Sequence, residues 1–503
     1  MSHIAVVRTR AAEGVHAPAV TVEVHLSASQ IAGFSIVGLP EAEVRESRDR
    51  VRAALASSAL DFPFGRLTVN LAPADLPKGG GRFDLAIALG ILAVSAQLPA
   101  ECLVGREFYG ELGLTGELRA VQGLLPAVLQ ASWADHAVIV PTGNAAEAGL
   151  VASATAHGAD SLLAVVAHLN GQASLPRCQP PAELSRDEQA ADLLDVRGQP
   201  QARRALEIVA AGGHHLLLVG PPGSGKTLLA SRLPGILPPL SETEALQAAA
   251  VASVAGQRFD PRRFRCRPFR APHHTASPVA LAGGGSMPRP GEISLAHHGV
   301  LFLDELTEWS RATLEVLREP LESGRVIVSR AAHQAEFPSA FQLVAAMNPC
   351  PCGWLDDPSG RCRCGPDQVA RYQSRISGPL LDRLDLQLRV PRPPVSAIDP
   401  SSPPDGEASA VVAARVAKAR QRQLDRQGCL NSGLGTRQLA SHVPLGERER
   451  ALMTRALERL ALSARGHHRV LRVARTIADL AGAERVDSRH LAEALGYRGQ
   501  QGA

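Results

Sequence analysis

Apolar positions recur along the chain with two periods, every second residue in short stretches and every third or fourth residue in longer ones. Ala19 to Ser27 alternates apolar and polar side chains, which predicts a half-buried strand. Glu41 to Ala59 gathers its large apolar residues on one face, which predicts an amphipathic helix. Leu216 to Val219 is apolar throughout and predicts a buried strand of a parallel sheet. Together the two patterns predict an α/β protein.

Two polar, proline-rich stretches divide the chain into three units. Residues 169–195 and 393–410 have the composition of linkers. They separate residues 1–168, 196–392 and 411–503, and 503 residues are too many for one hydrophobic core. In the last unit we expect helices at Val411 to Arg426, Gly446 to Leu462, Arg469 to Ala481 and Ser488 to Leu495.

The first unit combines strands with helices. A glycine-rich loop is expected at Pro73 to Arg82, followed by a buried helix at Phe83 to Ala96. Phe108 to Leu112 and Leu118 to Val121 predict a β-hairpin that turns at Thr115-Gly116.

The strand at Leu216 to Val219 ends in a complete G-x-x-x-x-G-K-T sequence, and a helical segment follows it. In this context the glycines allow backbone N–H groups and the helix N-terminus to point at phosphates. Lys226 adds a cation, and Thr227 supplies a hydroxyl to Mg²⁺. The sequence therefore predicts a nucleoside triphosphate site. Its predicted loop residues are Gly220, Pro221, Pro222, Gly223, Ser224, Gly225, Lys226 and Thr227.

A second motif, Gly299 to Leu306, is an apolar strand that ends in two carboxylates. Asp304 is placed to hold the Mg²⁺ shell together with Thr227, and Glu305 to orient and deprotonate the attacking water. The next expected strand, Phe341 to Met347, ends at Asn348, which suits a sensor of the γ-phosphate. A helical lid over the nucleotide is expected from the last unit, with Arg465 or Arg469 at the γ-phosphate.

Two insertions lengthen the nucleotide-binding unit. The first runs from His273 through the loop-forming residues up to Gly291. The second, Gly324 to Phe337, predicts a β-hairpin whose turn lies at Ala331 to Gln334. In ring-shaped motors such hairpins project into the pore, and the alternative is that both insertions pack against neighbouring subunits.

Four of the eight cysteines are clustered, and the other four are scattered. Cys350, Cys352, Cys362 and Cys364 form two C-x-C pairs around a nine-residue loop, a pattern that can close a structural Zn²⁺ site. A thiol-rich surface loop, or pairs that oxidise on isolation, is the alternative.

Composition and charge add few constraints. A formal net charge of +4 permits contact with nucleic acid without requiring it. The longest apolar run, Leu85 to Leu98, is too short to cross a bilayer, and the N-terminus lacks the apolar core of a signal peptide. With a nucleotide loop present, the cysteines favour a reducing cytoplasm, and we expect no membrane partner.

The first unit resembles the proteolytic domain of Lon in the segments LPKGGGRFDLAIAL and GELGLTGELRAVQGLLPA. In that family a Ser in the glycine-rich loop is activated by a Lys after the hairpin, and by position these would lie near Gly80 and Leu125. Neither side chain is present, and Lys78 has no hydroxyl beside it in the loop. The resemblance implies a Lon-like fold without peptidase activity.

The nucleotide motifs, both insertions, MNPCPCG, SGPLLDRLD and RVLRVARTIADL together resemble the magnesium-chelatase-like AAA+ ATPases. The Lon-like first unit narrows the resemblance to the ComM/YifB branch. It implies a Lon-like α+β domain, a central AAA+ domain with a parallel sheet, and a C-terminal helical lid. It also favours Arg383 as an arginine finger for the neighbouring subunit's γ-phosphate, a role that local sequence alone supports weakly.

The same resemblance implies an ATP-driven hexameric DNA helicase that promotes branch migration of recombination intermediates during natural transformation. Its expected partners are single-stranded and branched DNA and, plausibly, a recombinase. The densest basic run is the obvious place for phosphate contacts. It consists of Arg262, Arg263, Arg265, Arg267 and Arg270, with Phe264 and Phe269 between them. These phenylalanines suit base stacking or a half-buried strand equally, and Arg325, Arg330 and His333 of the hairpin are further DNA candidates.

Three other functions fit part of the sequence. A magnesium chelatase motor subunit, which drives metal insertion into a porphyrin, would have nearly the same ATPase core. A Lon-type protease would need the missing Ser and Lys. A non-catalytic, ATP-switched scaffold would have no need of Glu305.

Overall fold

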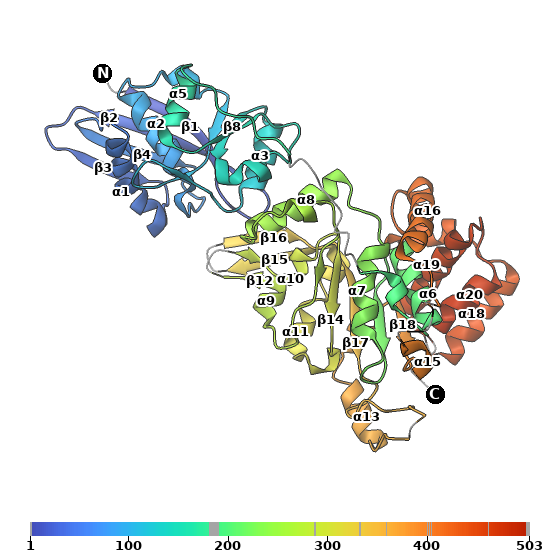
Figure 1. The fold of residues 1–503 in the computed structure, drawn as a ribbon. Helices are drawn as coiled ribbons and strands as arrows, with labels where there is room; N and C mark the ends of the chain where they lie inside the picture. Colours follow the sequence, from blue (N-terminus) through green and yellow to red (C-terminus); the bar gives the residue numbers. More distant parts are fainter. Residues whose placement is uncertain are drawn as a thin grey trace.

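The structure is a computed structural model that describes residues 3–180, 191–285, 288–330, 333–358, 360–399, 401, 403, 405–460 and 462–498. Figure 1 shows three units in chain order, the first blue to cyan, the central one green to yellow and the last orange to red. Part of the first expected linker, residues 181–190, lies outside the described residues. None of the described helices is long and apolar enough to cross a membrane.

The N-terminal unit is built on a mixed sheet of seven strands in the order β3-β4-β2-β1-β5-β8-β9. The expected strand at Ala19 to Ser27 is β2, and its alternate residues Val20, Val22 and Val24 are buried. The other strands are β1 (His3–Arg10), β3 (Gly33–Val37), β4 (Arg66–Ala72), β5 (Arg106–Phe108), β8 (Ala137–Pro141) and β9 (Ala156–Ala159).

Helices and a small hairpin complete this unit. Helix α2 (Asp84–Val94) lies on β1 and β2 and is almost wholly buried, which explains why it is apolar on every side. The expected hairpin is formed by β6 (Glu111–Leu112) and β7 (Leu118–Arg119), which pair antiparallel. The remaining helices are α1 (Ala42–Ser57), α3 (Leu124–Trp133), α4 (Ala145–Ala148) and α5 (Leu162–Leu169).

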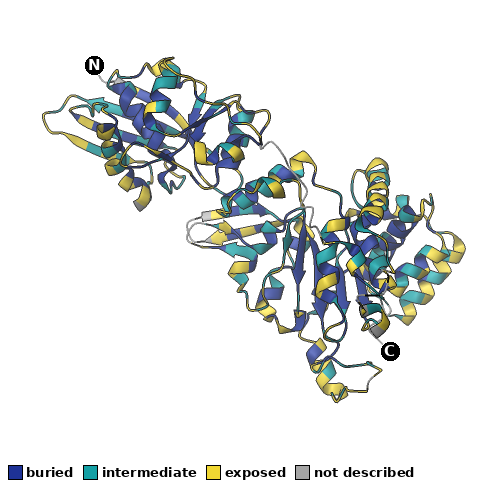
Figure 2. Cartoon of the chain, in the orientation of Figure 1, coloured by how far each residue is buried: buried dark blue, intermediate teal, exposed yellow. Residues whose placement is uncertain are grey.

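The central unit contains a five-stranded sheet in the order β11-β14-β17-β10-β18, and every neighbouring pair is parallel. Its three inner strands are almost entirely apolar and buried, as Figure 2 shows in dark blue, because helices cover both faces of a parallel sheet. The strands are β10 (Leu216–Val219), β11 (Phe269–Arg270), β14 (Val300–Leu303), β17 (Gln342–Met347) and β18 (Leu386–Arg389).

The helices around this sheet include several short ones. Helix α7 (Lys226–Ile236) follows the nucleotide loop directly and begins two residues earlier than expected. Helix α6 (Pro200–Gly212) begins at a proline, which suits the first turn of a helix. The others are α8 (Glu242–Val254), α9 (Pro278–Ala282), α10 (Glu292–Leu295), α11 (Arg311–Glu315), α12 (Pro320–Ser323), α13 (Pro366–Gln373), α14 (Gly378–Leu381) and α15 (Val395–Ile398).

Both insertions form antiparallel hairpins. The first contains β12 (Gly283–Gly284) and β13 (Arg289–Pro290). The second contains β15 (Arg325–Arg330) and β16 (His333–Pro338), and its second strand starts two residues before the predicted Ala335. The N-terminal unit contacts the base of this hairpin and the end of α8, because Gly14 lies beside Glu336 and the N–H of Gly123 donates to the carbonyl of Ser253 at 3.1 Å.

The expected C-terminal helical unit is present, and it packs on the helix that precedes the nucleotide loop. Helices α16 and α19 pack on α6, and their apolar residues share one core with it. This attachment brings α19 to the amino edge of the sheet, where the strands begin, because Thr476 bonds His214 just ahead of β10 at 2.8 Å. The helices are α16 (Ser409–Gln427), α17 (Thr436–His442), α18 (Glu447–Arg459), α19 (Ala464–Ala481) and α20 (Ser488–Gly496).

Two histidines at the amino edge, the buried His297 and the half-buried His215, make the stability of the fold sensitive to acid. Nδ1 of His215 accepts the N–H of Leu343 at 3.0 Å, and Nδ1 of His297 accepts the N–H of Ala340 at 3.0 Å. Burial lowers the pKa of His215 from 6.5 to about 4, and burial likewise lowers the pKa of His297 to about 3. Each ring is therefore neutral in the folded protein under conditions in which the unfolded chain is protonated.

We predict that the melting temperature falls as the pH drops from 6.5 toward 4, because stability that is fully present above pH 6.5 is lost as protons bind the unfolded chain. His215→Asn keeps an acceptor near the Nδ1 position and does not titrate. Thermal melts across this range should show a smaller drop for this variant than for the wild type. An identical drop would contradict the assignment.

Candidate active site

The predicted nucleotide residues meet at the carboxyl edge of the parallel sheet, where β10, β14 and β17 end side by side. The hydroxyl of Thr227 donates to Oδ2 of Asp304 at 2.7 Å, although the two are 77 residues apart. Nζ of Lys226 donates to Oδ1 of Asn348 at 3.3 Å. The fold thus brings together a lysine, a hydroxyl, a carboxylate and an amide, which are the groups needed to hold Mg²⁺ and the end of a triphosphate.

The nucleotide loop itself has the backbone that its glycines permit. Gly223 and Gly225 have φ angles of 73° and 85°, in the left-handed region that other residues avoid. Nζ of Lys226 also donates to the carbonyls of Gly220 and Pro221 at 2.7 and 3.0 Å, and burial lowers its pKa against the opposing charges of Asp304 and Glu305.

A residue that the sequence did not reveal supports the loop from outside. The side-chain amide of Gln199 donates to the carbonyl of Ser224 at 2.6 Å. Gln199 lies immediately before α6, which starts at Pro200. This proline could have identified Gln199 as a helix-capping residue, but nothing in the sequence indicates that Gln199 lies next to the nucleotide loop.

Glu305 is positioned by its backbone and by a histidine from the first insertion. Its φ angle is 51°, which turns the side chain away from the strand, and its N–H is bonded to Oδ1 of Asp304 at 2.8 Å. Oε2 of Glu305 lies 2.9 Å from Nδ1 of His274. His274 stacks on His273 with ring centroids 4.2 Å apart. The sequence suggested a loop here, and only the fold shows that this loop reaches the proposed base.

A basic cavity of about 590 Å³ lies at the opposite, amino edge of the sheet. Arg383, which precedes β18, and Arg465 and Arg469 from α19 all line it. Strand β10 separates this edge from the nucleotide loop by four residues, or about 13 Å. Arg465 and Arg469 therefore lie away from the nucleotide loop of their own chain, since α19 is anchored to the other end of the strands, and their contact with a γ-phosphate stays a prediction.

The cavity is strongly positive and partly neutralised. Arg469 pairs with Asp385 at 3.0 Å, and Arg383 donates to Glu322. Burial by itself would raise the pKa of Asp385, but His214 and Arg469 hold it well below its usual range. Burial and the charge of Arg267 lower the pKa of Arg420, which also lines the cavity, to about 9. Such a surface favours an anionic group from outside the chain.

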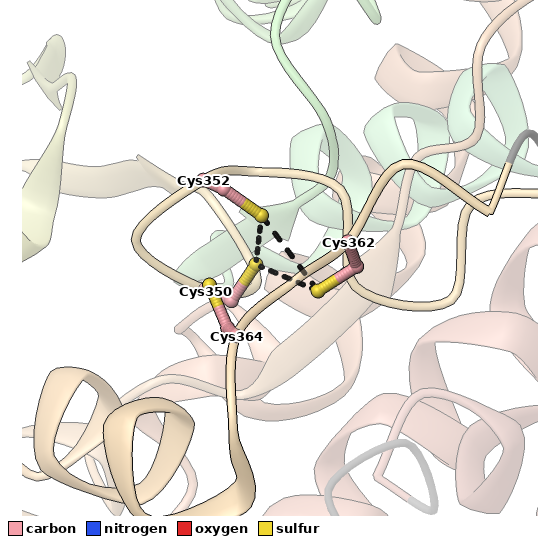
Figure 3. Close-up of side chains that lie close together, drawn as sticks. All are labelled: Cys350, Cys352, Cys362 and Cys364. Atoms are coloured by element: carbon pink, nitrogen blue, oxygen red, sulfur yellow. Dashed lines mark hydrogen bonds between the residues drawn. The ribbon is translucent and has the colours of Figure 1, made fainter.

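The four clustered cysteines converge on one point in the loop after β17, as Figure 3 shows. Their sulfur atoms all lie within 4.8 Å of one another. The Cys350–Cys352, Cys350–Cys362 and Cys352–Cys362 separations are 3.4, 3.8 and 3.7 Å. A tetrahedron of sulfurs at 2.3 Å from Zn²⁺ has edges of about 3.8 Å, so the donor set fits this ion.

The basic run before β11 is largely engaged in the structure of its own chain. Arg267 donates to the carbonyls of Pro238 and His298, and Arg270 forms a two-pronged pair with Glu292. Arg265 donates to the carbonyl of Leu240.

The aromatic residues of the same run also have partners within the chain. Phe269 lies in β11 and stacks on Phe302. Of the two expectations for Phe269, the half-buried strand is therefore the one that the structure supports, and not base stacking. Phe264 packs edge-on against Phe259. Arg262 and Arg263 are exposed and stay candidates for DNA contact.

The second insertion adds one described candidate. Arg325 is exposed and pairs with Glu336 across the hairpin at 3.2 Å. The side chains of Arg330 and His333 lie outside the described residues, so their expected DNA contacts stay predictions.

The Lon-like site in the N-terminal unit has the predicted shape without the chemistry. Gly80 has a φ angle of 75° in the loop before α2, and Leu125 is buried in α3. The Lys78 side chain is fully buried and donates to the carbonyl of Pro73. It therefore does not face a hydroxyl that it could activate.

Comparison with known proteins assigns all three units to one family. The family described as "Magnesium chelatase, subunit ChlI" matches residues 192–398, and its C-terminal counterpart matches residues 406–498. A third description, "Subunit ChlI of Mg-chelatase", matches residues 22–144. The Competence protein ComM of Haemophilus influenzae is 49% identical over 499 residues, which covers 98% of this chain and 97% of that protein. The chain belongs to the ComM/YifB family.

Further similarities agree with this membership. YifB of Escherichia coli is 49% identical to this ComM/YifB chain over 495 residues, and the match covers 98% of the chain and 97% of YifB. Lon protease 2 of Bacillus subtilis is 27% identical over 149 residues, 28% of the chain and 27% of that protein. This ComM/YifB protein is thus a magnesium-chelatase-like AAA+ protein with a partial similarity to Lon.

We predict that His274→Ala lowers kcat for ATP about tenfold and leaves the KM nearly unchanged. The half-exposed Glu305 carboxylate loses the contact that directs it, whereas the described contacts of His274 include none with the nucleotide loop. Steady-state hydrolysis measured alongside His273→Ala, which keeps the Glu305 contact, tests this. Equal losses in the two variants would show that the ring pair only supports the insertion.

Proposed function

We propose that the protein is an ATP-hydrolysing motor that forms a hexameric ring on single-stranded or branched DNA. It drives branch migration of recombination intermediates during natural transformation, the setting that the name of the H. influenzae competence protein supports. ATP is the fuel, Mg²⁺ its cofactor, and Zn²⁺ a structural cofactor held by the four cysteines.

One observation supports a ring-shaped assembly of subunits. The residues that bind and split ATP lie at the carboxyl edge of the sheet, whereas the arginine-lined cavity lies at the amino edge of the same chain. The two halves of an AAA+ site can meet only when one subunit's cavity faces the next subunit's nucleotide. Such a head-to-tail contact repeats from subunit to subunit, and it closes into a ring when the rotation between subunits returns the last one to the first.

The chemical roles follow from this arrangement. Lys226 and the loop N–H groups hold the β- and γ-phosphates, and Thr227 and Asp304 hold Mg²⁺. Glu305 removes a proton from the attacking water, which Asn348 helps to orient between loop and base. Arg383 of the neighbour, with Arg465, stabilises the charge that develops on the transferred phosphoryl group.

Motion reaches DNA through the two hairpins in this proposal. The first hairpin precedes Glu305 in the chain and the second follows it, so a movement of Glu305 during hydrolysis moves both hairpins. Exposed Arg262, Arg263 and Arg325 supply phosphate contacts, which carry no sequence information and therefore suit a translocating motor.

A second candidate function is the motor subunit of a magnesium chelatase, because the matched families are described as parts of that enzyme. Such a motor would hydrolyse ATP without a response to DNA and would act on partner proteins that bind a porphyrin. Stimulation of ATP hydrolysis by DNA alone separates the two functions.

We predict that Lys226→Ala abolishes ATP binding, whereas Glu305→Gln keeps binding and lowers turnover at least a hundredfold, the scale of losing a positioned base. Both variants should fail to unwind three-way and four-way DNA junctions. The measurements are ATP hydrolysis and junction unwinding with the wild type as reference. Normal ATP hydrolysis by Glu305→Gln would contradict the assignment of Glu305 as the catalytic base. A wild type whose hydrolysis does not respond to DNA and that unwinds no junction would contradict the DNA motor.

We predict that Arg383→Ala and Lys226→Ala are each nearly inactive alone but regain activity when mixed. At an interface between the two, an intact nucleotide loop meets an intact finger, which makes about a quarter of random interfaces complete. Hydrolysis is measured after the subunits have exchanged. Recovery also shows that Arg383→Ala is folded, and a mixture no more active than its parts would contradict a finger that acts across the interface.

A further inference from the structure

The loop that carries the four cysteines lies directly against the nucleotide loop. Gly353 follows Cys352, and its N–H donates to the carbonyl of Cys350 at 2.9 Å in a tight turn with a φ angle of 81°. A Cβ atom on Gly353 would lie 2.6 Å from Cδ of Pro222 and 3.7 Å from Cγ of Asn348. The backbone of the cysteine loop is therefore in van der Waals contact with the nucleotide loop and with the proposed sensor.

A tryptophan joins the same two loops a second time. Two guanidinium groups lie over the Trp354 ring, that of Arg361 at 5.2 Å and that of Arg392 at 4.3 Å from its centroid. Arg392 in turn donates to the carbonyl of Pro222 at 3.3 Å. Arg361 belongs to the cysteine loop and Arg392 follows β18, so the indole ties the cysteine loop to the strand beside the nucleotide loop.

The cysteine loop has a small buried core, although Asp356 pairs with Arg389 of β18 at 2.8 Å. Its described residues form no helix or strand between Met347 and α13, and only Cys350 and Gly353 are buried among the residues from Cys350 to Cys364. A segment with so small a core needs a cross-link to keep one conformation, since each ordered residue loses backbone entropy. Four sulfur atoms at the edge lengths of a zinc tetrahedron supply such a cross-link when the ion binds.

We propose that Zn²⁺ bound by Cys350, Cys352, Cys362 and Cys364 clamps the nucleotide loop, so that zinc occupancy controls the affinity for ATP. The zinc site holds Gly353 and Trp354 against Pro222. Pro222 fixes the turn whose N–H groups receive the phosphates, and Asn348, two residues before Cys350, stays in reach of Lys226. This inference rests on the proposed nucleotide site but not on the ring or on DNA.

Zinc content and ATP affinity are measured without DNA on four full-length chains. They are the wild type, Cys364→Ser, which lacks one ligand, Gly353→Ala, which keeps all four, and Cys102→Ser, which loses a thiol in the N-terminal unit. Elemental analysis reports zinc per chain, and a fluorescent ATP analogue with Mg²⁺ reports affinity. Circular dichroism checks that each variant is folded.

We expect about one zinc per chain in the wild type and in Cys102→Ser, with equal affinity for the analogue. Cys364→Ser should lose zinc and bind the analogue at least tenfold more weakly. Gly353→Ala should keep zinc and still bind at least tenfold more weakly, because its Cβ pushes the two loops apart. A zinc-selective chelator with Mg²⁺ in excess should weaken binding by the wild type, and added Zn²⁺ should restore it.

Two results would overturn the inference. A folded wild type without zinc removes the metal site, and full affinity in both the chelated wild type and Gly353→Ala removes the clamp. If Cys364→Ser does not fold, the chelated wild type and Gly353→Ala still decide the question. Because neither readout involves DNA, a protein that fails to unwind junctions can still confirm the clamp, and a motor that unwinds them can still lack it.

Discussion

The parallel pairing of β10 between β17 and β18 is the constraint on which the rest of the structure depends. Parallel strands all end at one edge, so the segments that follow β10, β14 and β17 must meet there, however far apart they are in the chain. Lys226, Thr227, Asp304 and Asn348 come into hydrogen-bond contact for this reason.

The same pairing separates the chemistry into two edges with opposite needs. The carboxyl edge collects carboxylates and one lysine, which suits a cation and a phosphate together. At the amino edge burial lowers the pKa of Arg420, to which the charge of Arg267 adds, and the edge collects an excess of arginines over carboxylates. In the proposed ring, a phosphate of the neighbouring subunit's nucleotide would balance this excess of positive charge. Within one chain, Arg383, the proposed arginine finger, pairs with Glu322 instead.

Residues outside the nucleotide motifs contact either the nucleotide loop or Glu305 beside it. Gln199, which precedes α6, donates to the carbonyl of Ser224 in the loop, and Gly353 of the cysteine loop packs against Pro222. His274 of the first insertion contacts Glu305 rather than the loop itself. The nucleotide site is therefore in direct contact with the first insertion and with the cysteine loop.

The sequence by itself determined the features that are contiguous or that follow from the periodicity of apolar residues. They are the nucleotide loop, the acidic strand end, the sensor strand, the four-cysteine pattern, the strand at Ala19 to Ser27 and the resemblance that named the family. Hydrogen-bonding capacity and apolar periodicity are properties of neighbouring residues, so a linear reading captures them. Only the tertiary structure decided that the last helices sit at the amino edge, that Arg267 and Arg270 are tied to their own chain, and that His274 touches Glu305. Those outcomes depend on which apolar face packs on which, and Leu206 of α6 buried with Val470 of α19, 264 positions later, belongs to a core that no local pattern contains.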